Sequence, residues 1–300
     1  MTGLLEFRIL GPLEAHVGGQ LVRLGGARQR SLLAALLIEA GRTQSLDRLA
    51  HAVWADEQPE SVRTQIAIRV HGLRKAFRAA GCDAPVIVTE KYGYRLATDV
   101  AWVDAEEAGA LTTRARTLAA AGDVDDAATL YGRALALWRG SALAELDSAA
   151  ITTAGRGLDD TRLEVAERWA DLELARGRPR EVVSRLAALV EEHPLREGLR
   201  ERLMLALSRA GRQADALESY RQGRELLLEE LGLEPGDGLR EAHQAVLRGM
   251  EEPAEPVHAV GRPAQLPPAV QGFVGRQEQL GLLDGLLEDA PYLPVAVVSG

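Results

Sequence analysis

The sequence predicts a mainly α-helical chain, in which an N-terminal helix-turn-helix domain with small antiparallel sheets precedes an all-α domain of helical repeats. Three observations support this fold class. Residues 5–26 alternate apolar and polar side chains between glycines, which is typical of short antiparallel strands. Three helical segments with tight connections follow. From residue 103 to 247 the pattern is almost entirely helical, and one helix, glycine, helix plan recurs there.

The three N-terminal helices have recognisable boundaries. Residues 29–39 form a strongly apolar helical run. Ser45 is the expected N-cap of a helix over residues 46–54, and Ser61 is the expected N-cap of a longer helix over residues 62–79. Because the connections between them are short, these helices predict a helix-turn-helix unit.

The third helix has one buried and one exposed face. At about 100° per residue, one narrow apolar stripe faces the core: Val62, Ile66, Val70, Leu73 and Phe77. The opposite face consists of Thr64, Ile68, His71 and Lys75, flanked by Arg63, Ala67, Arg74 and Arg78. A solvated helix face usually mixes both charges, whereas residues 61–81 contain no Asp or Glu. This absence favours a surface that faces phosphates.

Two side chains of the exposed face have more than one interpretation. Ile68 lies among polar neighbours, where it suits contact with a thymine methyl group, but it would also suit packing against a neighbouring strand or a second protomer. His71 is either a hydrogen-bond donor to a base or phosphate, or an ordinary exposed histidine. It is not a candidate metal ligand, because no second His or Cys lies at ligand spacing on this helix.

A hairpin is expected after the third helix. The segment APVIVTEKYGYRLA, residues 84–97, predicts two strands around a turn at residues 90–93, with Lys91 at the tip. Tyr94 and Leu96 are expected to pack this hairpin onto the core. The hairpin would therefore form a wing beside the helix-turn-helix.

The order of sheet, three helices and wing over residues 4–98, with the segments GLRKAFRA and KYGYRLA, resembles the winged helix-turn-helix effector domain of OmpR-type response regulators. The resemblance implies that the third helix enters the major groove of DNA. It implies base contacts from Thr64, Ile68 and His71, and phosphate contacts from Arg63, Arg74, Lys75 and Lys91. Gly72 departs from this family, in which a basic or polar residue is common here, so one DNA contact is expected to be missing.

The charge distribution separates this domain from the rest of the chain. The formal net charge is -9, yet residues 61–98 contain 7 Lys/Arg against 2 Asp/Glu. A local positive segment indicates contact with a polyanion, which the acidic remainder would repel. The single Cys82, the lack of a signal-like N-terminus and the lack of an apolar run of about 20 residues predict a cytoplasmic protein without membrane contact. No catalytic constellation is evident, so we expect no enzyme activity and no cofactor in this chain.

Residues 103–247 repeat a plan of helix, glycine, polar residues and helix around Gly122, Gly177 and Gly211. The spacing between the last two glycines is 34 residues, the period of tetratricopeptide arrays. The first spacing is 55 residues, and the inserted residues 138–155 predict a long connecting loop. Such arrays serve as scaffolds or as concave surfaces that hold peptides or helices, and both roles stay open.

The segments LYGRALALWRG and HPLREGLRERLMLALSRAGRQADALESYRQGRELLLEELGLEPGDGLREAHQAVL resemble the bacterial transcriptional activation domain of the Streptomyces antibiotic regulatory protein (SARP) family. With the winged helix, the resemblance spans about residues 4–248. It implies an activator of secondary-metabolite (antibiotic) gene clusters, which binds direct repeats in double-stranded DNA as a side-by-side homodimer. It also implies recruitment of RNA polymerase through its sigma subunit.

The sequence predicts four segments: a winged-helix domain over 1–98, a tetratricopeptide-like domain over 99–250, a Pro-rich linker over 251–268, and the beginning of a truncated nucleotide-binding domain over 269–300. The motif FVGR and the terminal run LPVAVVSG resemble the entry of a STAND or AAA-like ATPase domain. Gly300 would be the first glycine of its Walker A loop, so ATP and Mg²⁺ are expected only in a domain missing from this chain. The alternative function is an ATP-dependent switch that regulates the DNA-binding half.

Overall fold

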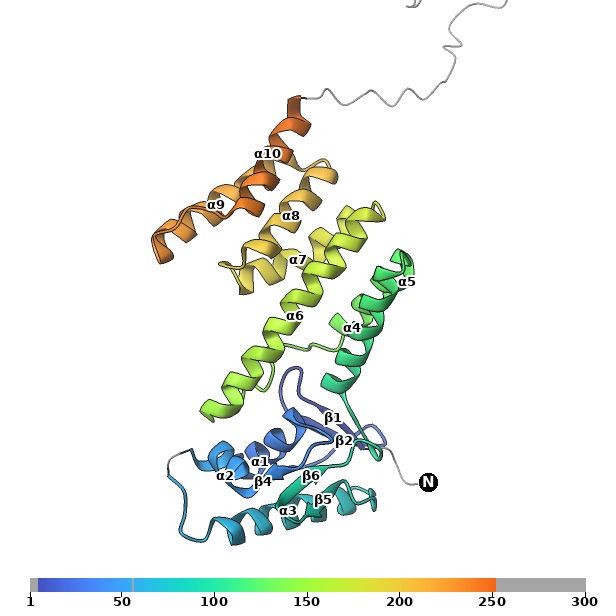
Figure 1. The fold of residues 1–300 in the computed structure, drawn as a ribbon, viewed down its shortest axis with the longest axis vertical. Helices are drawn as coiled ribbons and strands as arrows, with labels where there is room; N and C mark the ends of the chain where they lie inside the picture. Colours follow the sequence, from blue (N-terminus) through green and yellow to red (C-terminus); the bar gives the residue numbers. More distant parts are fainter. Residues whose placement is uncertain (1–4, 56, 252–300) are drawn as a thin grey trace, which may run out of the picture. The chain divides into compact units, whose positions relative to one another are not determined.

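Two small sheets frame three helices in the N-terminal part of the chain. The computed structural model describes residues 5–55 and 57–251 (Figure 1). The elements of this part are β1 (Leu5–Arg8), β2 (Glu14–Val17), β3 (Gln20–Leu21), α1 (Ala27–Ile38), β4 (Gln44–Ser45), α2 (Leu46–Trp54), α3 (Val62–Ala79), β5 (Ile87–Glu90), β6 (Gly93–Leu96) and β7 (Ala101–Val103).

The first sheet has the strand order β3-β2-β1-β7. The antiparallel pairing of β1 with β2 and of β2 with β3 confirms the strands predicted from alternation. The parallel strand β7 was not predicted; it pairs with β1 in the register Leu5 to Ala101. The sheet of the N-terminal part therefore includes residues that lie after the domain boundary predicted at residue 98.

The three helices cover this sheet and bury the expected stripe of α3. Ile66, Val70, Leu73 and Phe77 are buried, whereas Val62, also predicted for this stripe, is only partly buried at the start of the helix. Phe77 meets Phe7 of β1 edge to face at 5.6 Å between ring centroids. The cap of α2 is confirmed, because the Ser45 hydroxyl accepts a hydrogen bond from the Arg48 N–H. The predicted cap of α3 is wrong in detail. Ser61 precedes that helix, but its side chain makes no capping hydrogen bond, since its backbone is not extended.

The wing is a second sheet with the order β4-β6-β5. The strands β5 and β6 flank a two-residue tip, as predicted. Gly93 pairs with Ser45, and a Cβ atom at Gly93 would lie 1.8 Å from the Gln44 carbonyl oxygen. Only glycine therefore lets the wing approach β4 so closely.

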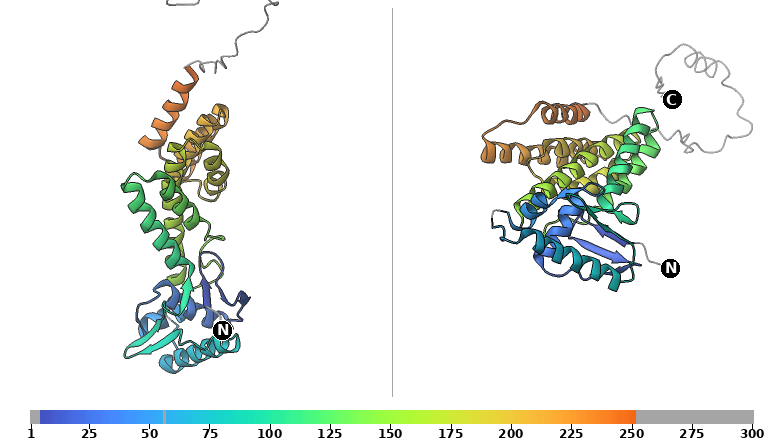
Figure 2. Two further views of the ribbon diagram at one scale, coloured as in Figure 1. Left: turned by 90° about the vertical axis from the view of Figure 1, so that its right-hand side faces the viewer. Right: turned by 60° about the horizontal axis from the view of Figure 1, so that its bottom comes forward.

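The helical part consists of three hairpins and a final helix (Figure 2). Its elements are α4 (Asp104–Ala120), α5 (Val124–Leu135), α6 (Ala149–Ala175), α7 (Pro179–Glu192), α8 (Glu197–Arg209), α9 (Gln213–Leu231) and α10 (Asp237–Glu251). The predicted hairpin glycines, Gly122, Gly177 and Gly211, all have positive φ, as helix C-terminal turns require. The predicted loop over 138–155 is partly wrong, because α6 already begins at Ala149.

The connection between α5 and α6 packs against the N-terminal part. The N–H of Arg139 donates to Leu10 O at 2.8 Å, and the N–H of Leu143 donates to Gly11 O at 2.8 Å. Leu143 is buried in the same apolar core as β1 and α3. This segment is therefore a structural element of both parts.

Asp104, the first residue of α4, completes this junction from the other side. Its carboxylate is buried and accepts hydrogen bonds from the N–H groups of Ile9, at 2.9 Å, and Leu10, at 3.0 Å. Burial raises the pKa of Asp104, while these backbone donors and the charge of Arg139 act in the opposite direction. The carboxylate satisfies two buried amides, which would otherwise lack partners.

Replacing Asp104 with alanine is expected to destabilise the protein by about 2–4 kcal/mol, because two buried N–H groups lose their acceptor. The midpoint of urea unfolding, followed by circular dichroism, measures this loss. Asp99→Ala is the matched control, since Asp99 is exposed, and it should change stability by less than about 0.5 kcal/mol. Equal midpoints for both variants would contradict the role of Asp104.

Candidate nucleic-acid interface

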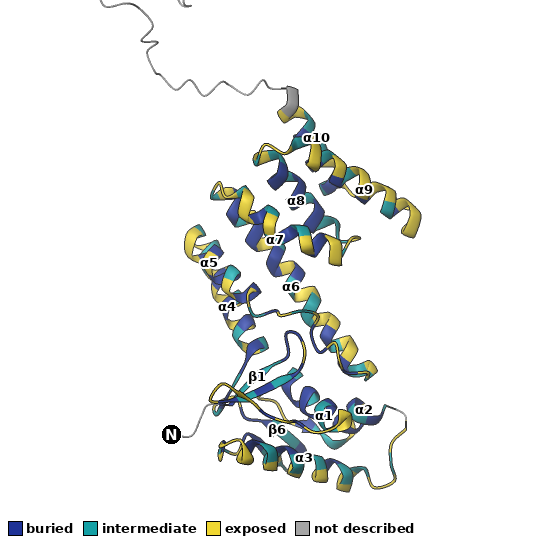
Figure 3. Cartoon of the chain, turned by 180° about the vertical axis from the view of Figure 1, so that it is seen from behind, coloured by how far each residue is buried: buried dark blue, intermediate teal, exposed yellow. Residues whose placement is uncertain are grey.

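The outer face of α3 carries the predicted contact residues together. Five of them are exposed along the same side of the helix: Arg63, Thr64, Ile68, His71 and Lys75. Figure 3 shows this exposed side in yellow and the buried stripe in blue. The apolar stripe fixes the orientation of the helix, so the polar residues at the complementary positions face outward.

The positive charge of α3 has no carboxylate partner in the described part of the protein. Among the described residues, no ion pair involves Arg63, Arg69, Arg74, Lys75 or Arg78. The helical part differs. On α9, Arg221 pairs with Glu218 and Glu225, and Arg224 pairs with Glu234. The basic side chains of α3 thus remain available to an external anion, whereas those of α9 already have carboxylate partners.

The wing lies along one flank of α3, and Arg74 holds it there. The Arg74 guanidinium donates to Ile87 O, at 2.6 Å from Nη2, and to the Thr89 hydroxyl at 2.9 Å. Sequence reasoning predicted only a phosphate contact for Arg74. The structure adds a structural role, since two of its three nitrogens are engaged with β5, and the phosphate contact stays a prediction.

The wing tip presents a cation and an aromatic ring. Lys91 lies at the tip, as predicted, and its Nζ is 5.1 Å from the ring centroid of Tyr92. Arg63 of α3 lines a shared hollow with both residues. Tyr92 is 70% exposed and was not among the predicted contacts, although its position beside Lys91 at a hairpin tip could have indicated it. Leu96 is buried and Tyr94 packs against the core, which confirms their predicted roles.

The structure narrows the interpretation of Ile68. Ile68 is 58% exposed, so packing against a neighbouring strand is wrong for the strands that the structure describes. A base contact and a contact with a second protomer stay open. His71 is also exposed, and it lines a hollow with Arg74 and β5. No cluster of three or more potential metal ligands occurs in residues 5–55 and 57–251.

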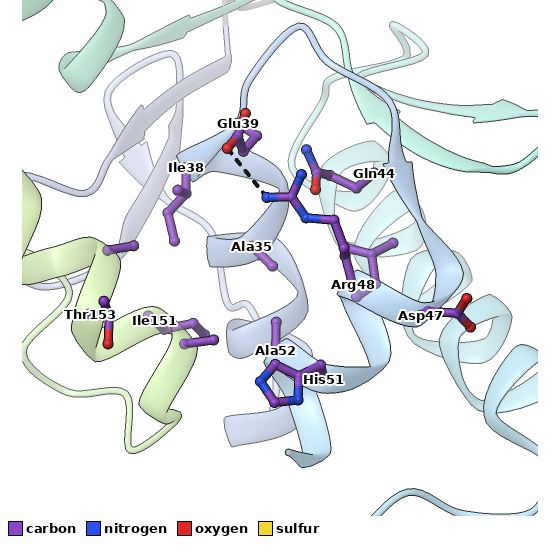
Figure 4. A pocket seen from close by; sticks show the side chains of 13 residues that line it. Ala35, Ile38, Glu39, Gln44, Asp47, Arg48, His51, Ala52, Ile151 and Thr153 are labelled. Carbon is purple, nitrogen blue, oxygen red and sulfur yellow. Dashed lines mark hydrogen bonds and ion pairs between the residues drawn. The ribbon is translucent and has the colours of Figure 1, made fainter. Parts of the chain in front are cut away.

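A different hollow, of about 590 Å³, lies between α1, α2 and the first turn of α6 (Figure 4). Its floor is apolar, with Ala35, Ile38 and Ile151, and the ion pair between Glu39 and Arg48 spans 3.4 Å at its edge. Because its carboxylates would repel phosphates, this hollow does not extend the basic surface.

No helix within the described parts of the chain is long and apolar enough to cross a bilayer.

Two protein families match the two parts of the chain. The profile of the bacterial transcriptional activator domain matches residues 103–247, and that of the C-terminal domain of transcriptional regulatory proteins matches residues 19–96. The chain is 39% identical to the regulatory protein AfsR of Streptomyces griseus over 99% of its own length, but spans only 31% of AfsR.

Two further relatives resemble the chain over most of its length. The transcriptional regulator RedD of Streptomyces coelicolor is 34% identical over 82% of the chain and 71% of RedD. The solved structure of Mycobacterium tuberculosis EmbR, in complex with a low affinity phosphopeptide, superposes with a TM-score of 0.74 at 34% identity, and the match covers 82% of this chain and 65% of EmbR. With both domains matched in this order, the chain belongs to the Streptomyces antibiotic regulatory protein family of transcriptional activators.

Proposed function

We propose that the chain binds duplex DNA sequence-specifically, with α3 in the major groove and the wing against the backbone. The observation that carries this proposal is the exposed face of α3, which has no acidic residue and forms no ion pair with any other described residue. An α-helix with side chains is about 10–12 Å wide, and the major groove is about 12 Å wide, so α3 fits the groove.

The side chains of this surface have distinct proposed roles. Thr64, Ile68 and His71 lie along the centre of the outer face and would contact base edges. The flanking and wing residues Arg63, Arg74, Lys75 and Lys91 would contact phosphates. Phosphate contacts set affinity and register, while the central side chains set sequence preference.

We also propose that two copies bind direct repeats side by side and activate a secondary-metabolite gene cluster by recruiting RNA polymerase through its sigma subunit. Family membership supports the role in activation. Two linked contacts raise affinity through effective concentration, which suits a small DNA-reading surface. The acidic helical part would repel DNA, so its surface is the better candidate for protein partners.

The predicted linker over 251–268, the nucleotide-binding segment over 269–300 and Gly300 lie outside the described residues. The ATP-dependent switch, and the binding of ATP and Mg²⁺ to a further domain, therefore stay predictions.

His71→Ala is expected to reduce sequence preference, because it removes a donor at the centre of the base-reading face. Footprinting on the intergenic regions beside the gene would first identify the bound site. Fluorescence anisotropy then compares Kd for this duplex and for a shuffled duplex. We expect the Kd for the shuffled duplex divided by the Kd for the bound site to fall about 5–150-fold, which corresponds to roughly 1–3 kcal/mol per base contact. An unchanged ratio would contradict base contact by His71.

Lys75→Ala is expected to weaken binding about equally on all sequences, because it removes a phosphate contact. The slope of log Kd against log salt should decrease in magnitude by about 1. Arg116→Ala is the matched control, since Arg116 is an exposed cation on α4, in the helical part, and its loss should leave the slope unchanged. If wild-type protein binds random and footprinted duplexes equally at physiological salt, the proposed function is wrong.

A further inference from the structure

A second basic group lies on the flank of α3 that faces away from the wing. Arg28, in the first turn of α1, and Arg69 of α3 line one hollow together with Ile68. The remaining lining residues carry no charge: Gly26, Ala27, Gln29 and Gln65. The hollow thus combines two guanidinium groups with no carboxylate.

Gly72 of α3 lies beside the first turn of α1. A Cβ atom at Gly72 would lie 2.9 Å from Oε1 of Gln29, the residue after Arg28. The missing side chain therefore leaves room for the amide end of Gln29 beside α3. The sequence predicted that one DNA contact is missing at Gly72. In the structure, Arg28 of α1 lies on the same flank of α3, beside Ile68 and Arg69.

Arg69 is held in place by two neighbours. Its Nη1 donates to the Gln65 carbonyl and side-chain oxygens, both at 2.8 Å, and its guanidinium carbon lies 4.8 Å from the ring centroid of Trp54. Burial lowers the pKa of Arg69, and the charge of Arg28 lowers it further. The two cations repel each other, so an anion bound between them would relieve this repulsion.

Neighbouring arginines outside this flank do have acidic partners. Arg30, two residues after Arg28, pairs with Glu145, and Arg42 pairs with Glu39 at 3.4 Å. In the described parts of the chain, no ion pair involves Arg28 or Arg69. Arg28 and Arg69 thus differ from Arg30 and Arg42, which already have carboxylate partners.

We propose that Arg28, supported by Arg69, binds a backbone phosphate on the DNA strand opposite the one that the wing contacts. This inference rests on the proposed function. At 100° per residue, Arg63 and Arg74 lie on the wing side of the outer face, while Gly72 and Arg69 lie on the other side. A helix in the major groove has one phosphate backbone along each of its two flanks. The wing would contact the backbone on one flank of α3, and Arg28 of α1 would contact the backbone on the other.

The test uses the full chain and the footprinted duplex, with single phosphates replaced one at a time by neutral methylphosphonates. In wild-type protein, several replacements are expected to weaken binding, each about tenfold, as the loss of one charged hydrogen bond would, and they include at least one on each strand. The affinity of Arg28→Ala should no longer change when the critical phosphate on one strand is replaced, but should still fall for the other strand. Lys91→Ala should show the opposite pattern. Arg28→Ala should also reduce the salt slope by about 1, while the matched control Arg42→Ala should not.

The outcomes separate this inference from the proposed function. If the wild-type protein lacks steep, sequence-dependent binding, both are wrong. If wild-type and Lys75→Ala proteins behave as expected but Arg28→Ala retains the wild-type slope and phosphate sensitivity, only the role of Arg28 is overturned. The same conclusion follows if Arg28→Ala and Lys91→Ala lose sensitivity to the same phosphate. Circular dichroism melting verifies that each variant is folded, and Arg28→Lys should restore most of the salt slope.

Discussion

The junction between the two parts of the chain depends on the buried carboxylate of Asp104. It accepts hydrogen bonds from the buried N–H groups of Ile9 and Leu10. Because a buried N–H without a partner is costly, β1 and the start of α4 must stay together. The backbone bonds from Arg139 and Leu143 to residues 10 and 11 close the same junction from the α5 to α6 connection. The helix-turn-helix is thereby fixed to the helical repeat through its sheet, on the side of the core away from α3.

Charge is distributed so that each part has a different class of partner. Carboxylates neutralise many arginines of the helical part, as at Arg202 with Asp171 and Arg224 with Glu234. Among the residues that the structure describes, the basic side chains of α3 have no such partners, and the guanidinium of Arg74 donates to neutral oxygens of the wing. Exposed ion pairs contribute little stability. Their main consequence here is that carboxylates lie beside these arginines of the helical part, whereas α3 itself contributes no carboxylate.

Local patterns were sufficient to predict much of the fold. The apolar stripe of α3 and the hairpin glycines are encoded within one or two helical turns, and the structure confirms both. The pairing of β7 with β1 and the hydrogen bonds to Asp104 join residues about 95 positions apart. Neither could be predicted from a local periodicity in the sequence. For the candidate surface, the sequence indicated which side chains of α3 point outward. It did not indicate that Arg74 holds the wing or that α1 brings Arg28 to the opposite flank, because both depend on how separate elements pack.

The junction also limits how such proteins can diversify. A recombination event at residue 98 would transfer α3 and the wing but leave behind β7, Asp104 and Leu143, which complete the sheet and core of the DNA-reading part. The transferred sheet and core would then have to fit the β7, Asp104 and Leu143 equivalents of the recipient. A successful exchange of DNA specificity between relatives must therefore carry the chain as far as Ile151, or change only the outward side chains of α3. Within this architecture, point substitution on one helix face is the shorter evolutionary route to a new target sequence.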